Sequence, residues 1–414
     1  MKCEIIAVGS ELTCGKTINT NAAFLGAEFQ KLGLESNFHT TVDDNTERIH
    51  EVLKQALNRA EIIITTGGLG PTHDDLTHEA IAGFFRTKLQ KDKKVLKKIK
   101  RKFDLKQKKM PKINIKQAYK PKNAKWIPNK LGTANGIIWK INFQGKKIYI
   151  LTFPGVPREL ISMWNETGKH FIEKISGKSC IYSKVLKFTG IGESALAEKL
   201  KGFFKLKDPV VAPYASIGEV KIVITAKETS KQNAVQAANK IAKSILKKTK
   251  DFHFGTDNET LEGLAGKKLL LKKKTIALAE SCTGGLLSKR LTDMPGSSKY
   301  LRFSIVSYSN ESKIKLLNVK KETLKEYGAV SPQIAYEMAR GVQRLGNSDI
   351  GFSITGIAGP NGGSKLKPVG LVYFGLALKN KVKIQKMFWG QDSTRDEIRF
   401  LSTQFALNWL RKNL

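Results

Sequence analysis

Apolar and polar positions alternate regularly over the first part of the chain. Short apolar runs, which are typical of buried strands, lie at residues 3–8, 35–42 and 61–66. Two segments between them, residues 21–31 and 49–57, carry apolar side chains at helical spacing. Strands that alternate with helices in this way predict βαβ units around a parallel sheet.

The next apolar runs predict a hairpin followed by a helix. Residues 136–141 and 146–153 are typical of strands, and an Asn-Phe-Gln-Gly turn joins them. The segment Pro154-Gly155-Val156-Pro157 then breaks the chain before a helix at 158–164.

Beyond residue 180 the pattern predicts a small α+β module and then a second α/β unit. The module has the order strand, helix, strand, strand, helix, at residues 183–188, 194–204, 210–214, 219–225 and 232–248. A polar stretch at 250–259 separates it from the last unit. That unit has strands expected at 275–279, 303–308, 349–355, 370–378 and 381–389, with helices at 283–291, at 331–345 and from 392. We therefore expect three domains, at residues 1–172, 173–252 and 258–414.

The chain is strongly basic, with 72 Lys and Arg against 36 Asp and Glu and a formal net charge of +36. Such a charge makes nucleic acid an obvious partner to consider. Residues 86–112 alone hold 14 basic and 2 acidic side chains. Within them, however, Val95, Leu96, Ile99 and Phe103 fall at helical spacing, which predicts an amphipathic helix with a solvated basic face. We therefore expect solvated surface here rather than a nucleic-acid site.

Composition and cysteine content exclude several classes of protein. A hydrophobic content of 41% with 26% charged residues is typical of globular chains. No uncharged apolar run approaches the ~18 residues of a membrane-spanning helix, and the apolar stretch at the N-terminus is too short for a signal-peptide core. The four cysteines are scattered without Cys-x-x-Cys spacing, which excludes a disulfide framework and a Cys-rich zinc site. We expect a cytoplasmic protein with no membrane contact.

A glycine-rich segment follows the third expected strand and has the sequence Thr65-Thr66-Gly67-Gly68-Leu69-Gly70-Pro71-Thr72-His73-Asp74-Asp75. Its glycines let the backbone approach a phosphate, and the helix that follows supplies N–H groups at the edge where open α/β sheets bind ligands. The carboxylates of Asp74 and Asp75 suit a hard divalent cation. The alternative is a tight turn with an aspartate as helix N-cap, and we favour the ligand site. His73 and His78 are spaced wrongly for one helical face, so we expect both on the surface.

A second motif, Ala279-Glu280-Ser281-Cys282-Thr283-Gly284-Gly285, places a serine between a strand and a helix. This layout suits a nucleophile whose oxyanion is stabilised by nearby helix N-terminal amides. The motif lacks the Gly-x-Ser-x-Gly elbow, and an ordinary N-cap serine is an equal alternative. Cys282 is a further candidate nucleophile, but no histidine follows residue 260 to activate it.

Further candidate groups follow the later strands of the same unit. Since no histidine is available there, a lysine kept neutral by burial is the natural base for a serine. Lys313 lies just after an expected strand end and is the candidate for this base. Tyr308 could relay the proton between the two side chains. Taken alone, Lys313 would be solvated surface. A backbone-rich loop, Thr355-Gly356-Ile357-Ala358-Gly359-Pro360, follows another strand. Arg395 and Arg399, one helical turn apart, suit a phosphate, although ion pairs with Asp392 or Asp396 are the alternative.

Together these motifs resemble those of the CinA family, the competence/damage-inducible proteins, over nearly the whole chain. The N-terminal matches are Gly9-Ser10-Glu11-Leu12, Gly15, Asn21, the Gly67–Asp75 segment, Asn114-Ile115-Lys116-Gln117-Ala118, Asn129, Gly132-Thr133-Ala134 and Pro154-Gly155-Val156-Pro157. The C-terminal matches are the Ala279–Gly285 motif, Tyr308-Ser309-Asn310 with Lys313, and Gly356-Ile357-Ala358-Gly359-Pro360.

The resemblance implies a fold for each domain. The N-terminal domain is expected to be a molybdopterin-binding-like three-layer α/β domain, the middle one a small α+β module of the KH type, and the last an α/β amidase domain. It also implies a homodimer.

The resemblance further implies two activities. The C-terminal domain would deamidate nicotinamide mononucleotide (NMN) without a cofactor, with Ser281 as nucleophile and Lys313 and Tyr308 as its activating partners. Substrate contacts are expected from Thr283, Gly284, Gly285, Asn310, Thr355, Gly356, Arg395 and Arg399. The N-terminal domain would hydrolyse ADP-ribose with a divalent metal, using Gly67, Gly68, Gly70, Thr72, Asp74 and Asp75, of which the two aspartates would be the metal ligands.

Two other functions compete with this interpretation. A binding protein for molybdopterin or a nucleotide would use the Gly67–Asp75 segment without hydrolysis. A nucleic-acid-associated factor would use residues 86–112 and the KH-like module. However, the module's Gly190-Ile191-Gly192 lacks the Gly-x-x-Gly spacing of KH loops. We therefore expect small-molecule substrates rather than nucleic acid.

Overall fold

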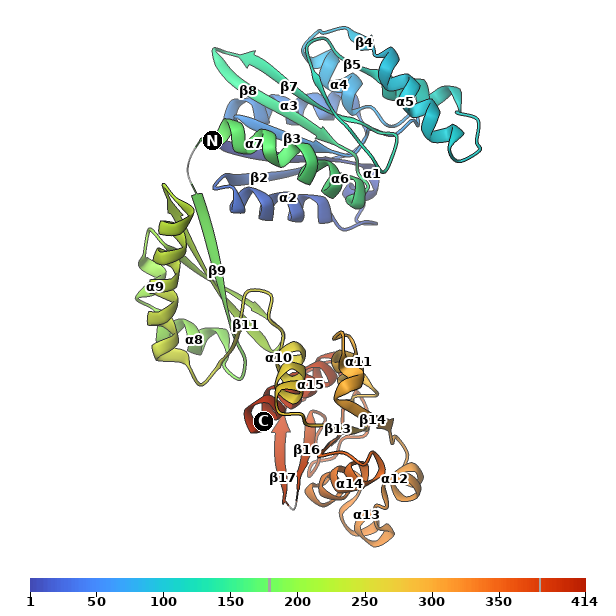
Figure 1. The fold of residues 1–414 in the computed structure, drawn as a ribbon, viewed down its shortest axis with the longest axis vertical. Helices are drawn as coiled ribbons and strands as arrows, with labels where there is room; N and C mark the ends of the chain where they lie inside the picture. Colours follow the sequence, from blue (N-terminus) through green and yellow to red (C-terminus); the bar gives the residue numbers. More distant parts are fainter. Residues whose placement is uncertain (178–179, 380) are drawn as a thin grey trace. The chain divides into compact units, whose positions relative to one another are not determined.

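The computed structural model describes residues 1–177, 180–379 and 381–414, and the side chains of Glu35 and Cys180 lie outside that description. The chain divides into two compact units (Figure 1). The first comprises Met1–Tyr182 with Ala226–Gln236, and the second comprises Ser183–Thr225 with Ala237–Leu414. No helix within the described residues is long and apolar enough to cross a membrane.

The N-terminal part is built on a six-stranded sheet in the order β2-β1-β3-β8-β7-β6. Strands β1, β2, β3 and β8 run parallel, whereas β7 pairs antiparallel with β8 and with β6, so the sheet is mixed. The strands are β1 (Lys2–Val8), β2 (Glu35–Val42), β3 (Ile62–Thr66), β6 (Lys125–Ile127), β7 (Gly136–Phe143) and β8 (Lys146–Phe153). A separate pair is formed by β4 (Leu89–Lys91) and β5 (Tyr119–Pro121).

Helices cover both faces of this sheet, so the N-terminal part has three layers. On one face the buried cluster joins α3 and α4 to the strands, and on the other it joins α2 and α6 to them. The helices are α1 (Ser10–Thr13), α2 (Thr20–Lys31), α3 (Thr46–Arg59), α4 (Thr77–Phe84), α5 (Lys93–Asp104), α6 (Pro157–Met163) and α7 (Lys169–Ser176). The expected helix at 158–164 therefore extends further, through a π-helical turn at Trp164–Gly168 into α7.

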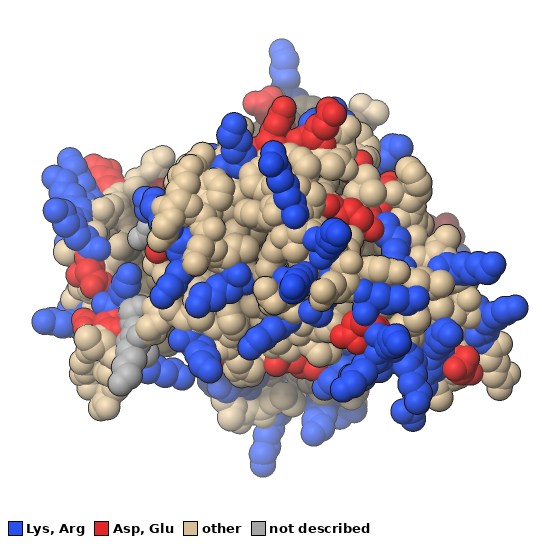
Figure 2. Space-filling model, turned by 90° about the horizontal axis from the view of Figure 1, so that it is seen from above, with Lys and Arg blue, Asp and Glu red and all other residues tan. Residues whose placement is uncertain are grey.

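The basic segment 86–112 contains the predicted amphipathic helix, which is α5. Asp92 caps its N-terminus by accepting hydrogen bonds from the backbone N–H groups of Lys94 and Val95. Val95 and Ile99 are buried on its inner side, and most of its lysines are exposed. Lys and Arg side chains project from much of the face shown in Figure 2, with Asp and Glu between them. Within α5, the basic side chains therefore form the solvated face that the pattern predicted.

The middle module is a four-stranded sheet in the order β10-β11-β9-β12. Its elements are β9 (Cys180–Phe188), α8 (Glu193–Leu200), β10 (Val210–Ser216), β11 (Glu219–Glu228), α9 (Lys231–Thr249) and β12 (His253–Thr256). The stretch 250–259, expected to be a polar separator, instead contains β12, which pairs antiparallel with β9. Four residues are too few for periodicity to reveal a strand.

The C-terminal domain has a five-stranded mixed sheet in the order β14-β13-β15-β16-β17. Its strands are β13 (Ile276–Glu280), β14 (Leu301–Val306), β15 (Ile350–Gly356), β16 (Leu371–Leu378) and β17 (Lys381–Phe388). Its helices are α10 (Leu261–Leu271), α11 (Leu286–Thr292), α12 (Asn310–Leu317), α13 (Lys321–Tyr327), α14 (Pro332–Leu345) and α15 (Arg395–Asn413).

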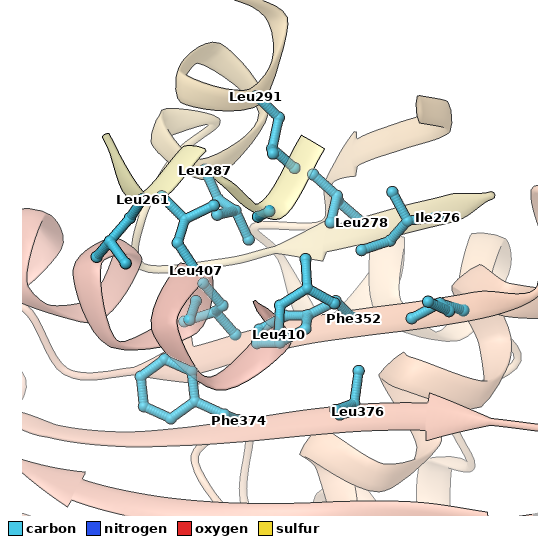
Figure 3. Close-up of a cluster of buried hydrophobic side chains, with 14 of the residues drawn as sticks. Leu261, Ile276, Leu278, Leu287, Leu291, Phe352, Phe374, Leu376, Leu407 and Leu410 are labelled. Carbon is cyan, nitrogen blue, oxygen red and sulfur yellow. The ribbon is translucent and has the colours of Figure 1, made fainter. Parts of the chain in front are cut away.

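The core of this domain lies on both faces of the sheet. On one face, side chains of α10, α11 and α15 pack on β13, β15 and β16, as Figure 3 shows for Leu287, Leu407 and Phe352. On the other face, α12, α13 and α14 pack on β13. This three-layer packing buries β13 completely, which fits its continuous apolar sequence.

The cysteines and His78 can also be compared with what the sequence predicted. Cys3, Cys14 and Cys282 are free thiols, while the side chain of Cys180 lies outside the described residues. The expectation that His78 is on the surface is wrong. Its ring is buried and contacts Thr152 Oγ1 at 2.9 Å, and burial lowers its pKa to about 4. Helical spacing could not reveal which of the two histidines, His73 and His78, faces the sheet.

Candidate active site

Three strands of the C-terminal domain end at one edge of the sheet and deliver the candidate residues there. Strand β13 runs parallel to both β14 and β15, so their carboxyl ends meet. Ser281 follows β13, Lys313 lies on α12 after β14, and Thr355 is near the end of β15. Open α/β sheets bind ligands at this edge.

Ser281 and Lys313, which are 32 positions apart in the sequence, are in direct contact. Lys313 Nζ lies 3.1 Å from Ser281 Oγ, and it also donates to the backbone oxygens of Ser307 at 2.7 Å and Tyr308 at 3.0 Å. Lys313 is 1% exposed and Ser281 is 9% exposed. The alternative that Lys313 is solvated surface is therefore wrong, since both side chains lie in the domain interior.

Burial changes the acid–base chemistry of this lysine. Loss of hydration disfavours the ammonium form and lowers the pKa of Lys313 to about 8. Within the described residues, Lys313 has no carboxylate ion-pair partner that would oppose this effect. Roughly a tenth of the lysine is thus neutral at pH 7 and about half at pH 8, and this neutral form is the one that a general base requires.

Ser281 is not an N-cap, so that alternative is also wrong. Helix α11 begins at Leu286, and its cap position is Gly285. Gly284 and Gly285 have φ values of +58° and +92°, which are left-handed and prevent the helix from starting at residue 283 as the sequence predicted. Residues 281–285 form a turn instead, and that turn presents the Ser281 hydroxyl to Lys313.

The amides of this turn are unequally available. The Gly284 N–H donates to Ser281 O at 3.1 Å, and the Gly285 N–H donates to Glu280 Oε2 at 3.1 Å. The backbone N–H groups of Cys282 and Thr283 make no hydrogen bond to another residue among the described ones, and that of Cys282 faces only its own thiol. In addition, the hydroxyls of Thr283 and Ser307 are buried without a partner there. Free polar groups therefore gather in the two segments that hold Ser281 and Lys313.

Tyr308 occupies a different place from that of a proton relay. Its side chain is 61% exposed, and its hydroxyl accepts a hydrogen bond from Arg395 Nη2 at 3.0 Å. Its backbone carbonyl, rather than its hydroxyl, contacts Lys313. Arg395 Nη1 also donates to Gly359 O at 2.7 Å, which connects the start of α15 to the loop after β15.

Arg399 lies one turn further along α15 and faces the nucleophile turn. Its Nε and Nη2 donate to Thr283 O at 3.2 and 3.0 Å, and its Nη1 is 3.7 Å from Asp396 Oδ1. Arg399 therefore contributes to holding the turn, and its expected pairing with Asp396 is partly present. Arg395 remains the exposed cation at this end of α15.

The remaining candidate residues have structural contacts or lie at the margin of the site. The Thr355 hydroxyl is buried and donates to Ala329 O at 2.7 Å. At Gly356 a Cβ atom would come within 2.7 Å of Leu371 O, so the close approach of β16 requires glycine. Asn310 is the exposed first residue of α12. Burial raises the pKa of the Cys282 thiol to about 12, which leaves it protonated and unsuited to act as the nucleophile.

Sequence reasoning did not assign a role to Glu280, which is completely buried at the end of β13. Its carboxylate accepts hydrogen bonds from the turn and the start of α11. An acidic residue inside an otherwise apolar strand was the signal that could have identified it.

The N-terminal candidate residues also lie together, around a cavity of about 540 Å³. The six predicted positions, Gly67, Gly68, Gly70, Thr72, Asp74 and Asp75, all line it. Gly67 and Gly68 have φ values of +100° and +63°, and a Cβ atom on Gly67 would lie 2.0 Å from Val8 O. These glycines are therefore required by the loop itself, whether or not a phosphate binds.

The two aspartates of this loop differ in what they do. Asp75 accepts hydrogen bonds from Gly70 N at 2.7 Å, Thr72 N at 2.9 Å and Thr72 Oγ1 at 2.5 Å, so it closes the turn. Asp74 is exposed. Five carboxylates and no Lys, Arg or His line the cavity, which favours a divalent cation as the counter-charge for a phosphate. However, no group of three or more metal-binding side chains is assembled among the described residues. A cation here would thus depend on phosphate oxygens for further ligands.

Comparison with known proteins covers all three regions of the chain. Residues 258–414 match the CinA C-terminal domain, residues 4–174 match a probable molybdopterin binding domain, and residues 183–255 match the KH domain of the damage-inducible protein CinA. A CinA-like protein of Microcystis aeruginosa is 46% identical, with 100% of this chain and 99% of that protein covered. A CinA-like protein of Dictyoglomus turgidum is 45% identical, with the same coverage.

Among solved structures, a competence/damage-inducible protein from Agrobacterium tumefaciens is 39% identical. The match covers 36% of this chain and 93% of that one, with a TM-score of 0.35. Because curated CinA-like relatives match along the full length of the sequence, the chain belongs to the CinA family.

Proposed function

We propose that the C-terminal domain is an amidohydrolase that deamidates NMN to nicotinate mononucleotide and ammonia. The observation that carries this proposal is the buried contact of 3.1 Å between Lys313 Nζ and Ser281 Oγ. A serine with a desolvated lysine beside it is an activated nucleophile for acyl transfer. Membership of the CinA family agrees with this assignment.

The three contacts of Lys313 match the needs of a neutral amine. A neutral amine has two N–H groups and one lone pair. The carbonyls of Ser307 and Tyr308 accept the two N–H groups, so the lone pair is directed at the Ser281 hydroxyl. In this arrangement Lys313 accepts the Ser281 proton without moving. The ammonium form reverses the third contact and donates to Ser281 Oγ.

The reaction then follows in balanced steps. Ser281 Oγ bonds to the carboxamide carbon while its proton passes to Lys313, and the carbonyl oxygen takes the negative charge. Lys313 returns the proton to the leaving nitrogen as the C–N bond breaks, which releases ammonia and leaves an ester on Ser281. Water attacks that ester with Lys313 again as the base, and nicotinate mononucleotide departs as Ser281 recovers its proton.

The oxyanion is assigned to the backbone N–H groups of Cys282 and Thr283. The amides of Gly284 and Gly285 are used within the protein, which leaves those of the first two residues after the nucleophile. Amides that receive charge only in the transition state accelerate the chemical step rather than tighten substrate binding.

Arg395 is the proposed contact for the 5′-phosphate of NMN. Its side chain is exposed, and it is held at the mouth of the site by Gly359 O and Tyr308 Oη. A guanidinium fixed in this way keeps N–H groups free for a phosphate oxygen. Arg399 is not assigned this role, because its guanidinium already holds Thr283 O.

The test is to incubate the purified chain with NMN at pH 8 and to measure ammonia and nicotinate mononucleotide. We expect both products in equal amounts. Absence of ammonia release by folded protein contradicts the proposal.

A second function is favoured by the N-terminal cavity. We propose metal-dependent hydrolysis of the pyrophosphate bond of ADP-ribose there, supported by the acidic lining and by the exposed carboxylate of Asp74. A divalent cation would supply charge neutralisation of the phosphates when it is bound. Turnover of ADP-ribose that requires added Mg²⁺ or Mn²⁺ is the expected result. Metal-dependent binding without turnover favours the alternative of a binding protein.

A further inference from the structure

We propose that Glu280 is a positioning residue of the amidase site, which holds the turn that carries Ser281 in its reactive geometry. This inference rests on the proposed amidase function. It concerns a side chain that does not itself touch the reacting atoms, because Glu280 points away from Lys313 and toward the start of α11.

The Glu280 carboxylate accepts four hydrogen bonds. Oε2 accepts from the backbone N–H groups of Gly285 and Leu287, both at 3.1 Å. Oε1 accepts from Ser288 N at 2.7 Å and from Ser288 Oγ at 2.5 Å. The carboxylate therefore caps α11 from outside the helix, in place of the side-chain cap that Gly285 cannot supply.

These bonds close the turn between Ser281 and α11. One end of the turn is fixed by Ser281 N, which donates to Ile354 O of β15 at 3.0 Å. Its middle is fixed by Arg399, which donates to Thr283 O. Glu280 fixes the far end at Gly285. Without it, two consecutive left-handed glycines would leave that end free to move, because glycine has the widest choice of backbone conformation.

The same bonds decide which amides remain for the oxyanion. The N–H of Gly285 is occupied by Glu280, and the N–H of Gly284 by Ser281 O. The amides of Cys282 and Thr283 are thus left free and are held at a constant position relative to Ser281 Oγ. Glu280 thereby acts on the transition state through the backbone, while NMN's phosphate contact lies on another element, α15.

Burial of the Glu280 carboxylate costs free energy of desolvation, which its hydrogen bonds must offset. Glu280 is 0% exposed, and no basic side chain forms an ion pair with it in the part of the chain that the structure describes. A buried carboxylate without a cation is tolerated only when hydrogen bonds satisfy it. Its charge also contributes, after burial, to the raised pKa of Cys282, and so helps to keep the neighbouring thiol neutral.

The test replaces the carboxylate by an amide of the same shape, in the full chain. In Glu280→Gln one oxygen becomes an NH₂ group, which would face the N–H groups of Gly285 and Leu287 or those of Ser288. A donor then opposes donors, and the turn must open. Asp349→Asn is the matched control, because Asp349 accepts from Thr275 N and Oγ1 at the opposite, amino end of β13 and β15.

We expect Glu280→Gln to lower kcat for NMN about 100-fold, the loss that a misplacement near 1 Å produces, with KM changed less than about threefold. Asp349→Asn should keep the parental kcat. A fluorophosphonate probe that labels serine nucleophiles should react more slowly with Ser281 in Glu280→Gln than in the parent. If Glu280→Gln is not recovered folded, Glu280→Asp, whose carboxylate is one methylene too short, takes its place with the same readouts.

The outcomes separate this inference from the proposed function. Parental kcat in the Glu280 variant, or an equal loss in Asp349→Asn, overturns the positioning role. If the parent itself releases no ammonia from NMN, the amidase proposal fails. The positioning role of Glu280 is then tested by the labelling rates of Ser281 alone. Equal rates in the parent and in Glu280→Gln overturn the inference.

Discussion

At the residue scale, burial singles out one lysine from a chain with 72 basic side chains. The order of the motifs and the family resemblance indicated Ser281 and Lys313 as catalytic residues. Composition alone predicted that any lysine of this chain is exposed to solvent. The distinction depends on α14 and α12 packing over β13, which removes water from Lys313. The local sequence around Lys313 does not show which distant segments pack over it.

The pH dependence of deamidation follows from this burial. Because Lys313 must be neutral to accept a proton and its pKa is lowered to about 8, kcat/KM should rise about tenfold per pH unit below pH 8 and level off above it. Initial rates at low NMN concentration between pH 6 and 10 measure this profile. A flat profile between pH 6 and 8 would remove Lys313 as the base.

Lys313→Arg provides the matching test of the base. Guanidinium stays protonated throughout this range, so we expect a loss of several orders of magnitude in kcat/KM at every pH. Circular dichroism should confirm that the variant is folded. Robust activity of Lys313→Arg would exclude Lys313 as the base.

At the element scale, periodicity predicted most buried strands and long helices, because their burial repeats along the local sequence, but it missed α10 (Leu261–Leu271). It failed where single residues set a boundary. Left-handed Gly284 and Gly285 delay the start of α11 to Leu286, and β12 is too short to show a pattern. The contacts made by α15 could not be predicted either. Arg395 and Arg399 carry the same charge and lie one helical turn apart, but they bind different partners.

Arg395 at the first turn of α15 should govern recognition of the phosphate. Loss of a charge-assisted contact in Arg395→Met should lower kcat/KM for NMN about 10- to 100-fold, mainly through KM. Nicotinamide riboside, which lacks the phosphate, should be a poor substrate for the parent and equally poor for the variant. An equal fall for both substrates would show that Arg395 acts on the chemistry instead.

At the scale of the whole molecule, the family resemblance gave the fold class of each part, and the matches over all three regions agree with it. Local patterns could not give the strand orders, because β1 lies between β2 and β3, and β13 between β14 and β15, only through pairing of distant segments.

The two candidate sites belong to separate sheets, so their residues should act independently. Asp75→Ala removes three hydrogen bonds and should destabilise the N-terminal domain by about 2 kcal/mol, whereas exposed Asp74→Ala should change stability by less than about 0.5 kcal/mol. Urea unfolding measures both. Ammonia release from NMN should stay at the parental rate in each variant, and a parallel loss would contradict independent sites.

The most direct measurement of the central claim is ammonia release from NMN by Ser281→Ala, compared with Thr260→Ala. Thr260 caps α10 in the same domain, and its loss should cost about 1 kcal/mol of stability without affecting turnover. Removing a covalent nucleophile should lower kcat by several orders of magnitude in a protein that stays folded. Turnover by Ser281→Ala within a few fold of Thr260→Ala would contradict the account.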